Sequence, residues 1–143
     1  MTDLDLLEKR LAFIETCVRE LRELARPAEL ERDVRERRFV ERTLQLAIQA
    51  TLDVASHIVS DERLGEPDTN RALIDLLVGA GWLGEEQREA LGNMAGFRNV
   101  LVHGYTAVDV AIVRGVLAHH LEDLEGFVTS VRRRLRASGA ARR

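Results

Sequence analysis

The longest helix-forming segment of this sequence contains the stretch Val40-Glu41-Arg42-Thr43-Leu44-Gln45-Leu46-Ala47-Ile48-Gln49, followed after three residues by Asp53-Val54-Ala55-Ser56-His57-Ile58. Apolar residues recur in it at three- and four-residue steps, the period that places them on one face of an α-helix. We expect this helix to run from Ala28 or Asp33 to Leu64. A long apolar face must be covered by other elements, so the segment predicts a helical bundle.

A polar row accompanies the apolar face of this helix. Glu41, Gln45 and Gln49 follow one another at four-residue steps, and Asp53 and His57 continue the series. Each step drifts by roughly 40° on an ideal helix, so the row winds slowly across the surface. Two interpretations stay open: a solvated seam with hydrogen bonds between neighbours, or a polar strip that faces a site or a subunit interface.

Apolar periodicity also predicts the remaining helices, and no alternating β pattern of useful length occurs. We expect helices at about Asp3–Ala25, from Asp68 or Thr69 to Val78, at about Glu85–Val102, and from a capping box at Thr106 and Asp109 to about Arg136. The predicted fold is therefore an all-α, four-to-five-helix bundle. One domain spans residues 1–137, and residues 138–143 form a frayed basic tail.

Composition excludes several classes of protein. The 143 residues are 45% hydrophobic and 31% charged, which is typical of a soluble globular domain. Aromatic residues make up only 4%, which argues against stacking platforms for single-stranded nucleic acid.

Cys17 is the only cysteine, so no intrachain disulfide forms, and no Cys/His spacing resembles a zinc site. Without an apolar signal segment or a membrane-length apolar run, we expect a cytoplasmic protein with no membrane contact, no metal and no cofactor.

Charge is distributed unevenly along the chain. The net charge is −3, which does not suggest a general nucleic-acid coat protein, yet six arginines gather at the C-terminus: Arg132, Arg133, Arg134, Arg136, Arg142 and Arg143. One interpretation is a solvated helix end, where cations complement the helix dipole. The other is an arm that attracts phosphate groups.

The chemistry-bearing residues are concentrated in Arg98-Asn99-Val100-Leu101-Val102-His103-Gly104-Tyr105. On an ideal helix, Arg98 falls within roughly 60° of the apolar residues Leu91 and Met94, so it points along the packed face. A buried guanidinium needs a carboxylate, a phosphate or carbonyl partners. His103 lies about 140° away from Arg98, so the spacing predicts a helix end at Gly104, a site shared by two protomers, or both.

These residue types suit RNA cleavage without a metal ion. A histidine can remove the proton from a 2′-hydroxyl or return one to the leaving oxygen. An arginine can stabilise the charge that develops on phosphorus, and Asn99 can orient a phosphate or the imidazole. The alternative is structural: Arg98 pairs with a core carboxylate such as Asp53, and His103 merely caps a helix.

The segment Arg98–Tyr105 resembles the signature of HEPN-domain proteins, and more narrowly that of the HepT-like toxins of bacteria and archaea. The segments Glu41–Gln49 and Asp53–Ile58 resemble the same family, as does Met94-Ala95-Gly96-Phe97 before the motif. An Arg-x4-His pattern alone is weakly specific. Together with Asn99, Tyr105 and the matching long helix it is fairly specific, and the likeness covers nearly the whole chain.

The resemblance implies a bundle that dimerises through its motif-bearing helices and joins two motifs in one cleft. It implies the toxin of a type VII-like toxin–antitoxin pair, a metal-independent endoribonuclease for which tRNA is a plausible target. Arg98 and His103 would be catalytic. The implied partner is a minimal nucleotidyltransferase antitoxin, which neutralises the toxin by transferring AMP to Tyr105.

Two other functions stay open at this point. The chain could be a non-catalytic subunit that binds a nucleotidyltransferase and a nucleotide, as its acidic balance suggests. It could also be a purely structural helical dimer, in which case an internal carboxylate would saturate Arg98.

Overall fold

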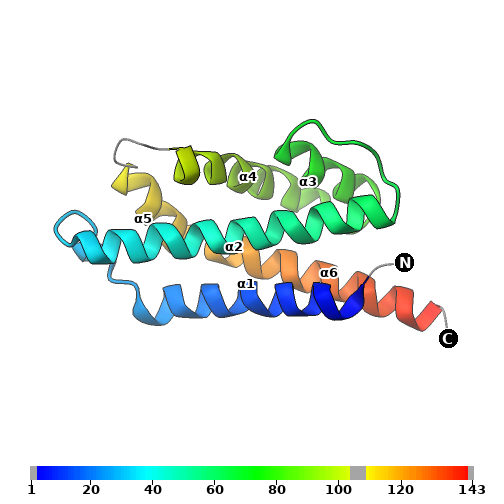
Figure 1. Ribbon diagram of the computed structural model, residues 1–143, viewed down its shortest axis with the longest axis horizontal. Coiled ribbons are helices and arrows are strands. Elements are labelled where there is room, and N and C mark those ends of the chain that lie inside the picture. Colours follow the sequence, from blue (N-terminus) through cyan, green and yellow to red (C-terminus); the bar gives the residue numbers. More distant parts are fainter. Residues whose placement is uncertain (1–2, 104–108, 142–143) are drawn as a thin grey trace.

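The computed structural model describes residues 3–103 and 109–141; the side chains of His103, Ala140 and Ala141 lie outside this description. Within these ranges all regular structure is helical (Figure 1). The α-helices are α1 (Leu4–Leu24), α2 (Val34–Asp61), α3 (Asn70–Gly79), α4 (Arg88–His103), α5 (Val110–His119) and α6 (Leu121–Ala141), with short 3₁₀ turns at Pro27–Glu29 and Glu85–Gln87. The predicted all-α bundle is confirmed.

Side-chain caps set the starts of the first three helices. Asp3 accepts a hydrogen bond from the backbone N–H of Leu6 at 3.1 Å, and Thr69 accepts one from Ala72 at 3.1 Å. Asp33 caps α2 by accepting from the N–H of Arg35 at 2.9 Å. Each cap satisfies an N–H group that has no partner within its helix. Of the two starts expected for the long helix, the one at Asp33 is therefore correct.

The single fifth helix expected from the sequence is wrong. The chain forms two helices, α5 and α6, with a break at His120, whose backbone leaves the helical conformation at φ −122° and ψ 0°. The break is supported by the His120 side chain, whose Nδ1 lies 2.8 Å from Oδ2 of Asp123 in the first turn of α6. Apolar spacing runs on through the break, which is why periodicity alone could not reveal it.

The start of α5 and the end of α6 also differ from the prediction. Asp109 itself caps α5, accepting from the N–H of Ala111 at 2.9 Å, while Thr106, the expected cap, lies outside the described residues. Helix α6 extends to Ala141, so residues 138–141, expected as part of a frayed tail, continue the helix. Arg142 and Arg143 lie outside the described residues.

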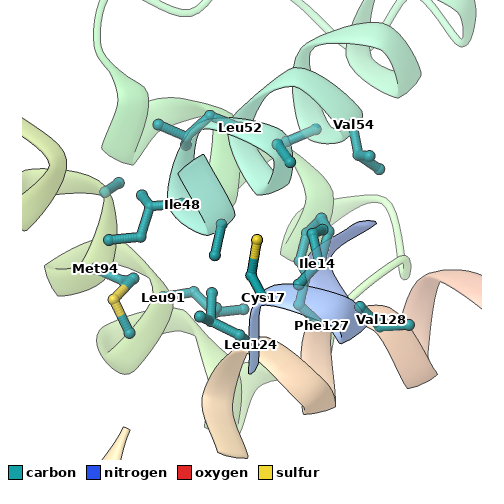
Figure 2. Packing of buried hydrophobic residues seen from close by; sticks show 14 of the residues in the cluster. Ile14, Cys17, Ile48, Leu52, Val54, Leu91, Met94, Leu124, Phe127 and Val128 are labelled. Atoms are coloured by element: carbon teal, nitrogen blue, oxygen red, sulfur yellow. The ribbon is translucent and has the colours of Figure 1, made fainter. Parts of the chain in front are cut away.

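One hydrophobic core holds the bundle together. Figure 2 shows buried residues that four helices contribute to this core: Ile14 and Cys17 of α1, Ile48 and Leu52 of α2, Leu91 and Met94 of α4, and Leu124 and Phe127 of α6. Burying one large aliphatic or aromatic side chain contributes about 1.5–3 kcal/mol before the entropy of ordering the chain is subtracted. Packing of these apolar faces therefore dominates the stability and fixes the helix arrangement.

Helix α2 lies between α1 and α4 in Figure 1 and packs against both. Its buried face carries the apolar residues of the central segment, including Leu44, Ile48 and Val54. The residues on its opposite side are only partly covered, and Gln49 and Asp53 are half-buried there. These two members of the polar row thus lie between α1, which supplies Arg10, and α4, which supplies Arg98.

Two of the C-terminal arginines have structural partners. Arg132 of α6 donates to Glu8 at 2.8 Å and lies 2.7 Å from Glu15, which ties α6 to α1. The guanidinium of Arg134 lies 5.5 Å from the ring centre of Trp82, within range of a cation–π interaction. Arg133 and Arg136 are exposed. In the described part of the chain, no helix has the length and apolar character needed to cross a membrane.

Candidate functional site

Arg98 lies on the side of α4 that faces α2, as its helical position predicts. Leu91 and Met94 on the same side are buried, and Arg98 is half-buried. Its Nε donates to Oε1 of Gln49 at 3.0 Å, and its Nη1 donates to Oδ1 of Asn99 at 3.2 Å. A residue from each of two helices therefore holds the guanidinium in place.

The hydrogen-bonded chain continues along α2 to α1. Gln49 donates from Nε2 to Oδ1 of Asp53 at 2.9 Å, and Oδ2 of Asp53 lies 3.5 Å from Nη1 of Arg10. An amide can satisfy a guanidinium and a carboxylate together only with its oxygen toward the first and its nitrogen toward the second. The two neighbours thus fix the orientation of the Gln49 amide.

The expected alternative of a direct Arg98–Asp53 pair is wrong. Asp53 is occupied by Gln49 and Arg10, and the partners of Arg98 in the described part of the chain are both neutral amides. A guanidinium has five N–H donors, of which these two contacts use one each. The positive charge of Arg98 is consequently not cancelled by a direct carboxylate contact among the described residues, and it can attract an anion.

His103 is the last described residue of α4, and the helix end predicted at Gly104 lies outside the described residues. Its side chain, Gly104 and Tyr105 lie outside the described residues. Five positions separate His103 from Arg98 on α4, about 140° around an ideal helix axis. On one straight helix these two positions therefore lie on different faces. The roles expected for Arg98, His103, Tyr105 and Asn99 stay predictions.

The polar row of α2 divides into two parts with different surroundings. Gln49 and Asp53 belong to the Arg98 network. His57 instead has its Nε2 3.2 Å from Oδ2 of Asp61, without the alignment of a hydrogen bond. The sequence predicted the polar row but did not indicate which of its members would belong to the Arg98 network, and it assigned no role to Arg10. The one available signal for Arg10 is its position beside the apolar stripe of Leu7, Leu11 and Ile14.

Among residues 3–103 and 109–141, no group of three or more His, Cys, Asp or Glu side chains is placed to hold a metal ion. Among the described side chains, the site presents a held guanidinium and two amides, and the backbone of His103 follows five positions later on the same helix.

The profile of the family described as ribonuclease HepT-like matches residues 14–131, most of the chain. The chain belongs to this family. The HepT-like chain is 29% identical to the mRNA nuclease HepT of Shewanella oneidensis over 129 residues, which cover 90% of this chain and 97% of that protein.

Solved structures with the same fold include two chains from toxin–antitoxin complexes. The first, from a complex with AMP-PNP, has a TM-score of 0.83 at 28% identity and covers 90% of the HepT-like chain and 98% of its own. The second is from a tri-AMPylated S. oneidensis HEPN toxin in complex with MNT antitoxin, with a TM-score of 0.82 at 28% identity and coverages of 92% and 98%.

A third similar structure extends the fold beyond these complexes. The cytosolic protein YutE of Bacillus subtilis, whose function is unknown, has a TM-score of 0.86 at 20% identity and covers 96% of this chain and 93% of its own. At that identity the likeness concerns the fold alone. The expected HEPN-like bundle is thus confirmed, while dimerisation stays a prediction.

Proposed function

We propose that this HepT-like chain is the toxin of a toxin–antitoxin pair and a metal-independent endoribonuclease, with Arg98 and His103 as catalytic residues. The observation that carries the proposal is the environment of Arg98. Its guanidinium is held by Gln49 and Asn99, both neutral, so its charge stays available for a phosphate. The name of the S. oneidensis relative, an mRNA nuclease, supports the same class of activity.

The proposed reaction uses the RNA's own 2′-hydroxyl as the nucleophile. His103 removes the proton from this hydroxyl, the 2′-oxygen bonds to the adjacent phosphorus, and the bond to the 5′-oxygen breaks. A second proton, supplied by a histidine or by water, goes to the leaving 5′-oxygen. The products are a 2′,3′-cyclic phosphate and a 5′-hydroxyl. Arg98 stabilises the negative charge that builds up on the phosphoryl oxygens, and Asn99 steadies Arg98 by accepting from its Nη1.

A homodimer would solve the geometric problem that one α4 helix poses. Arg98 and His103 lie about 140° apart around the helix axis, so one straight helix does not direct both to the same phosphate. Pairing α4 with its copy around a two-fold axis would bring Arg98 of one protomer toward His103 of the other. The active form in this proposal is therefore the dimer.

We further propose a nucleotidyltransferase antitoxin that attaches AMP to Tyr105. Supporting this, the similar S. oneidensis toxin is tri-AMPylated and bound to an MNT antitoxin. Tyr105 follows the catalytic His103 by two residues. An AMP group there would add bulk and negative charge where the RNA phosphate must bind, and both effects oppose binding.

Cleavage of purified RNA tests the catalytic proposal. Protein made by cell-free synthesis should cut RNA in the presence of EDTA, whereas Arg98→Ala and His103→Ala should each lower the rate at least about 100-fold. Arg19→Ala, an exposed arginine on α1, is the matched control and should retain activity. Sequencing of the fragments separates tRNA, the target that the resemblance suggests, from mRNA, the target in the relative's name.

Intact mass tests the partner proposal. Co-expression with a nucleotidyltransferase encoded beside this chain should add one or more AMP groups to wild type and none to Tyr105→Phe. If the protein leaves RNA uncut, is not modified and instead binds ATP tightly, it is a non-catalytic nucleotide-binding subunit and the toxin proposal fails.

A further inference from the structure

A surface groove of about 440 Å³ lies between α1 and α2, directly beside the Arg98 network. Lys9, Arg10 and Phe13 line it from α1, and Leu46, Gln49 and Asp53 line it from α2. Phe13 follows Lys9 by four residues and Arg10 by three, and the α2 residues follow one another at steps of three and four, so each set lies on one side of its helix. The groove is thus a continuous concave surface between two long helices, and the catalytic role proposed for Arg98 does not account for it.

The ring of Phe13 is exposed in this groove. Its exposed fraction is 42%, whereas Trp82, Phe97 and Phe127 are all buried. In the described part of the chain no other aromatic ring is exposed to this extent. An exposed aromatic side chain beside apolar surface is a typical contact for a planar ligand, because a ring offers a face on which a base can stack. One ring suits one base, which is compatible with the low aromatic content of the chain.

The charge of the groove favours a ligand that carries phosphate. Lys9, the only lysine of the sequence, is exposed and forms no ion pair with another described residue. Arg10 is partly compensated by Asp53 at 3.5 Å. Two cations and one carboxylate leave the groove with a net positive charge, in a protein whose overall charge is −3. An apolar partner would gain nothing from Lys9, which no described carboxylate pairs with, whereas a phosphate would.

Gln49 connects the groove to the proposed active site. It lines the groove and also accepts the hydrogen bond from Nε of Arg98 at 3.0 Å. An RNA strand with its cleaved phosphate at Arg98 would therefore pass over Gln49 as it enters the groove. The nucleotide next to the cleaved bond then lies between α1 and α2.

We propose that this groove is a nucleotide subsite, in which Phe13 stacks on the base adjacent to the cleaved phosphate and Lys9 contacts the next phosphate of the strand. The subsite deepens the ribonuclease proposed above and rests on it. Its function is to bind and position substrate, so it should act on KM and on the choice of cleavage position, with little effect on the chemical step.

Cleavage kinetics on short oligonucleotides test the subsite. Phe13→Ala should raise KM roughly ten-fold with kcat nearly unchanged, and Phe13→Tyr should restore the wild-type KM because it keeps the ring. Leu24→Ala is the matched control, since Leu24 is an exposed apolar residue of α1 outside the groove. Lys9→Gln should raise KM and lessen its salt dependence, whereas Arg19→Gln, at an exposed arginine of the same helix, should do neither.

An abasic substrate gives the sharper test. Removing the base beside the cleavage position should raise KM for wild type but have no further effect on Phe13→Ala, because both changes delete the same contact. Additive effects would overturn the proposal. So would a Phe13→Ala variant that loses its dimer in light scattering, since the groove would then be covered by a second copy of the chain.

Failure of the subsite can be told apart from failure of the ribonuclease. A 2′-O-methyl oligonucleotide cannot be cleaved through its 2′-oxygen, so its binding is measured apart from chemistry. Wild type that neither cleaves RNA nor binds this analogue overturns the proposed function. Wild type that cleaves RNA, with KM and analogue binding unaffected by Phe13→Ala, overturns the subsite alone.

Discussion

The guanidinium of Arg98 donates its Nε hydrogen to Oε1 of Gln49 at 3.0 Å, which joins the motif helix α4 to the middle of α2. Gln49 is itself fixed by its hydrogen bond to Asp53 at 2.9 Å. The amide therefore orients Arg98 without cancelling its charge. A carboxylate at position 49 would hold the guanidinium more tightly but would compete with a phosphate for it.

Two substitutions of Gln49 should distinguish its role in positioning Arg98 from the effect of a charge at position 49. Gln49→Leu removes the acceptor for Arg98, and loss of a hydrogen bond to a charged group, about 1.5–3 kcal/mol, should lower kcat roughly 10- to 100-fold. Gln49→Glu should keep Arg98 in place yet raise KM, because the new carboxylate neutralises it. Steady-state cleavage kinetics measure both effects. Gln45→Leu, one turn earlier in the same row, is the control and should leave kcat and KM near wild type.

Arg98→Lys tests whether the site needs the guanidinium fork as well as its charge. A lysine ammonium cannot donate to Gln49 and Asn99 in the same fixed geometry and still present N–H groups to a phosphate. We expect cleavage at least about ten-fold slower than wild type but faster than Arg98→Ala, measured under single-turnover conditions. Equal rates for Arg98→Lys and wild type would contradict a role for the amide contacts.

The thiol of Cys17 should react only slowly with thiol reagents in the folded protein. Burial raises the pKa of its thiol to about 11, and only 2% of the residue is exposed. At pH 8 almost none of the thiol is therefore ionised, and the thiolate is the reactive form. A colorimetric thiol reagent should react slowly with the native protein and rapidly in urea. Fast reaction without denaturant would mean that α1 opens locally far more often than this core packing implies.

The Arg132 contacts should contribute to stability in a pH-dependent way. The Arg132 side chain donates to Glu15 and lowers the pKa of that carboxyl below its ordinary value of 4.5. A carboxyl whose pKa is lowered by folding stabilises the protein above the unfolded pKa, and this contribution is lost as the pH falls through the folded pKa. Urea unfolding from pH 7 to pH 3 should show the decline, and Glu15→Gln should flatten it.

Arg132→Ala should lower the free energy of unfolding by about 1 kcal/mol at pH 7, since solvent screens its pairs with the half-exposed Glu8 and Glu15. Arg133→Ala, at the exposed neighbouring position, is the control. Equal losses in the two variants would indicate that the ion pairs across α1 and α6 contribute nothing.

Some features could be predicted because they depend on local spacing. Apolar residues at three- and four-residue steps identified α1, α2 and the inward direction of Arg98. Asp33 and Thr69 are capping residue types at the places where helices begin. The break at His120 could not be predicted in this way, because the apolar stripe of α5 passes into α6 without a change of period.

The sequence by itself determined the helical class and the buried faces of the helices. It also contains the motif with its arginine, histidine and tyrosine. Only the tertiary structure decided which partners those groups have. Arg98 meets Gln49 rather than Asp53, because Asp53 is occupied by Gln49 and by Arg10, a residue 43 positions away in the sequence. Periodicity describes one helix at a time, whereas these contacts arise from how α1 and α4 pack on the two sides of α2.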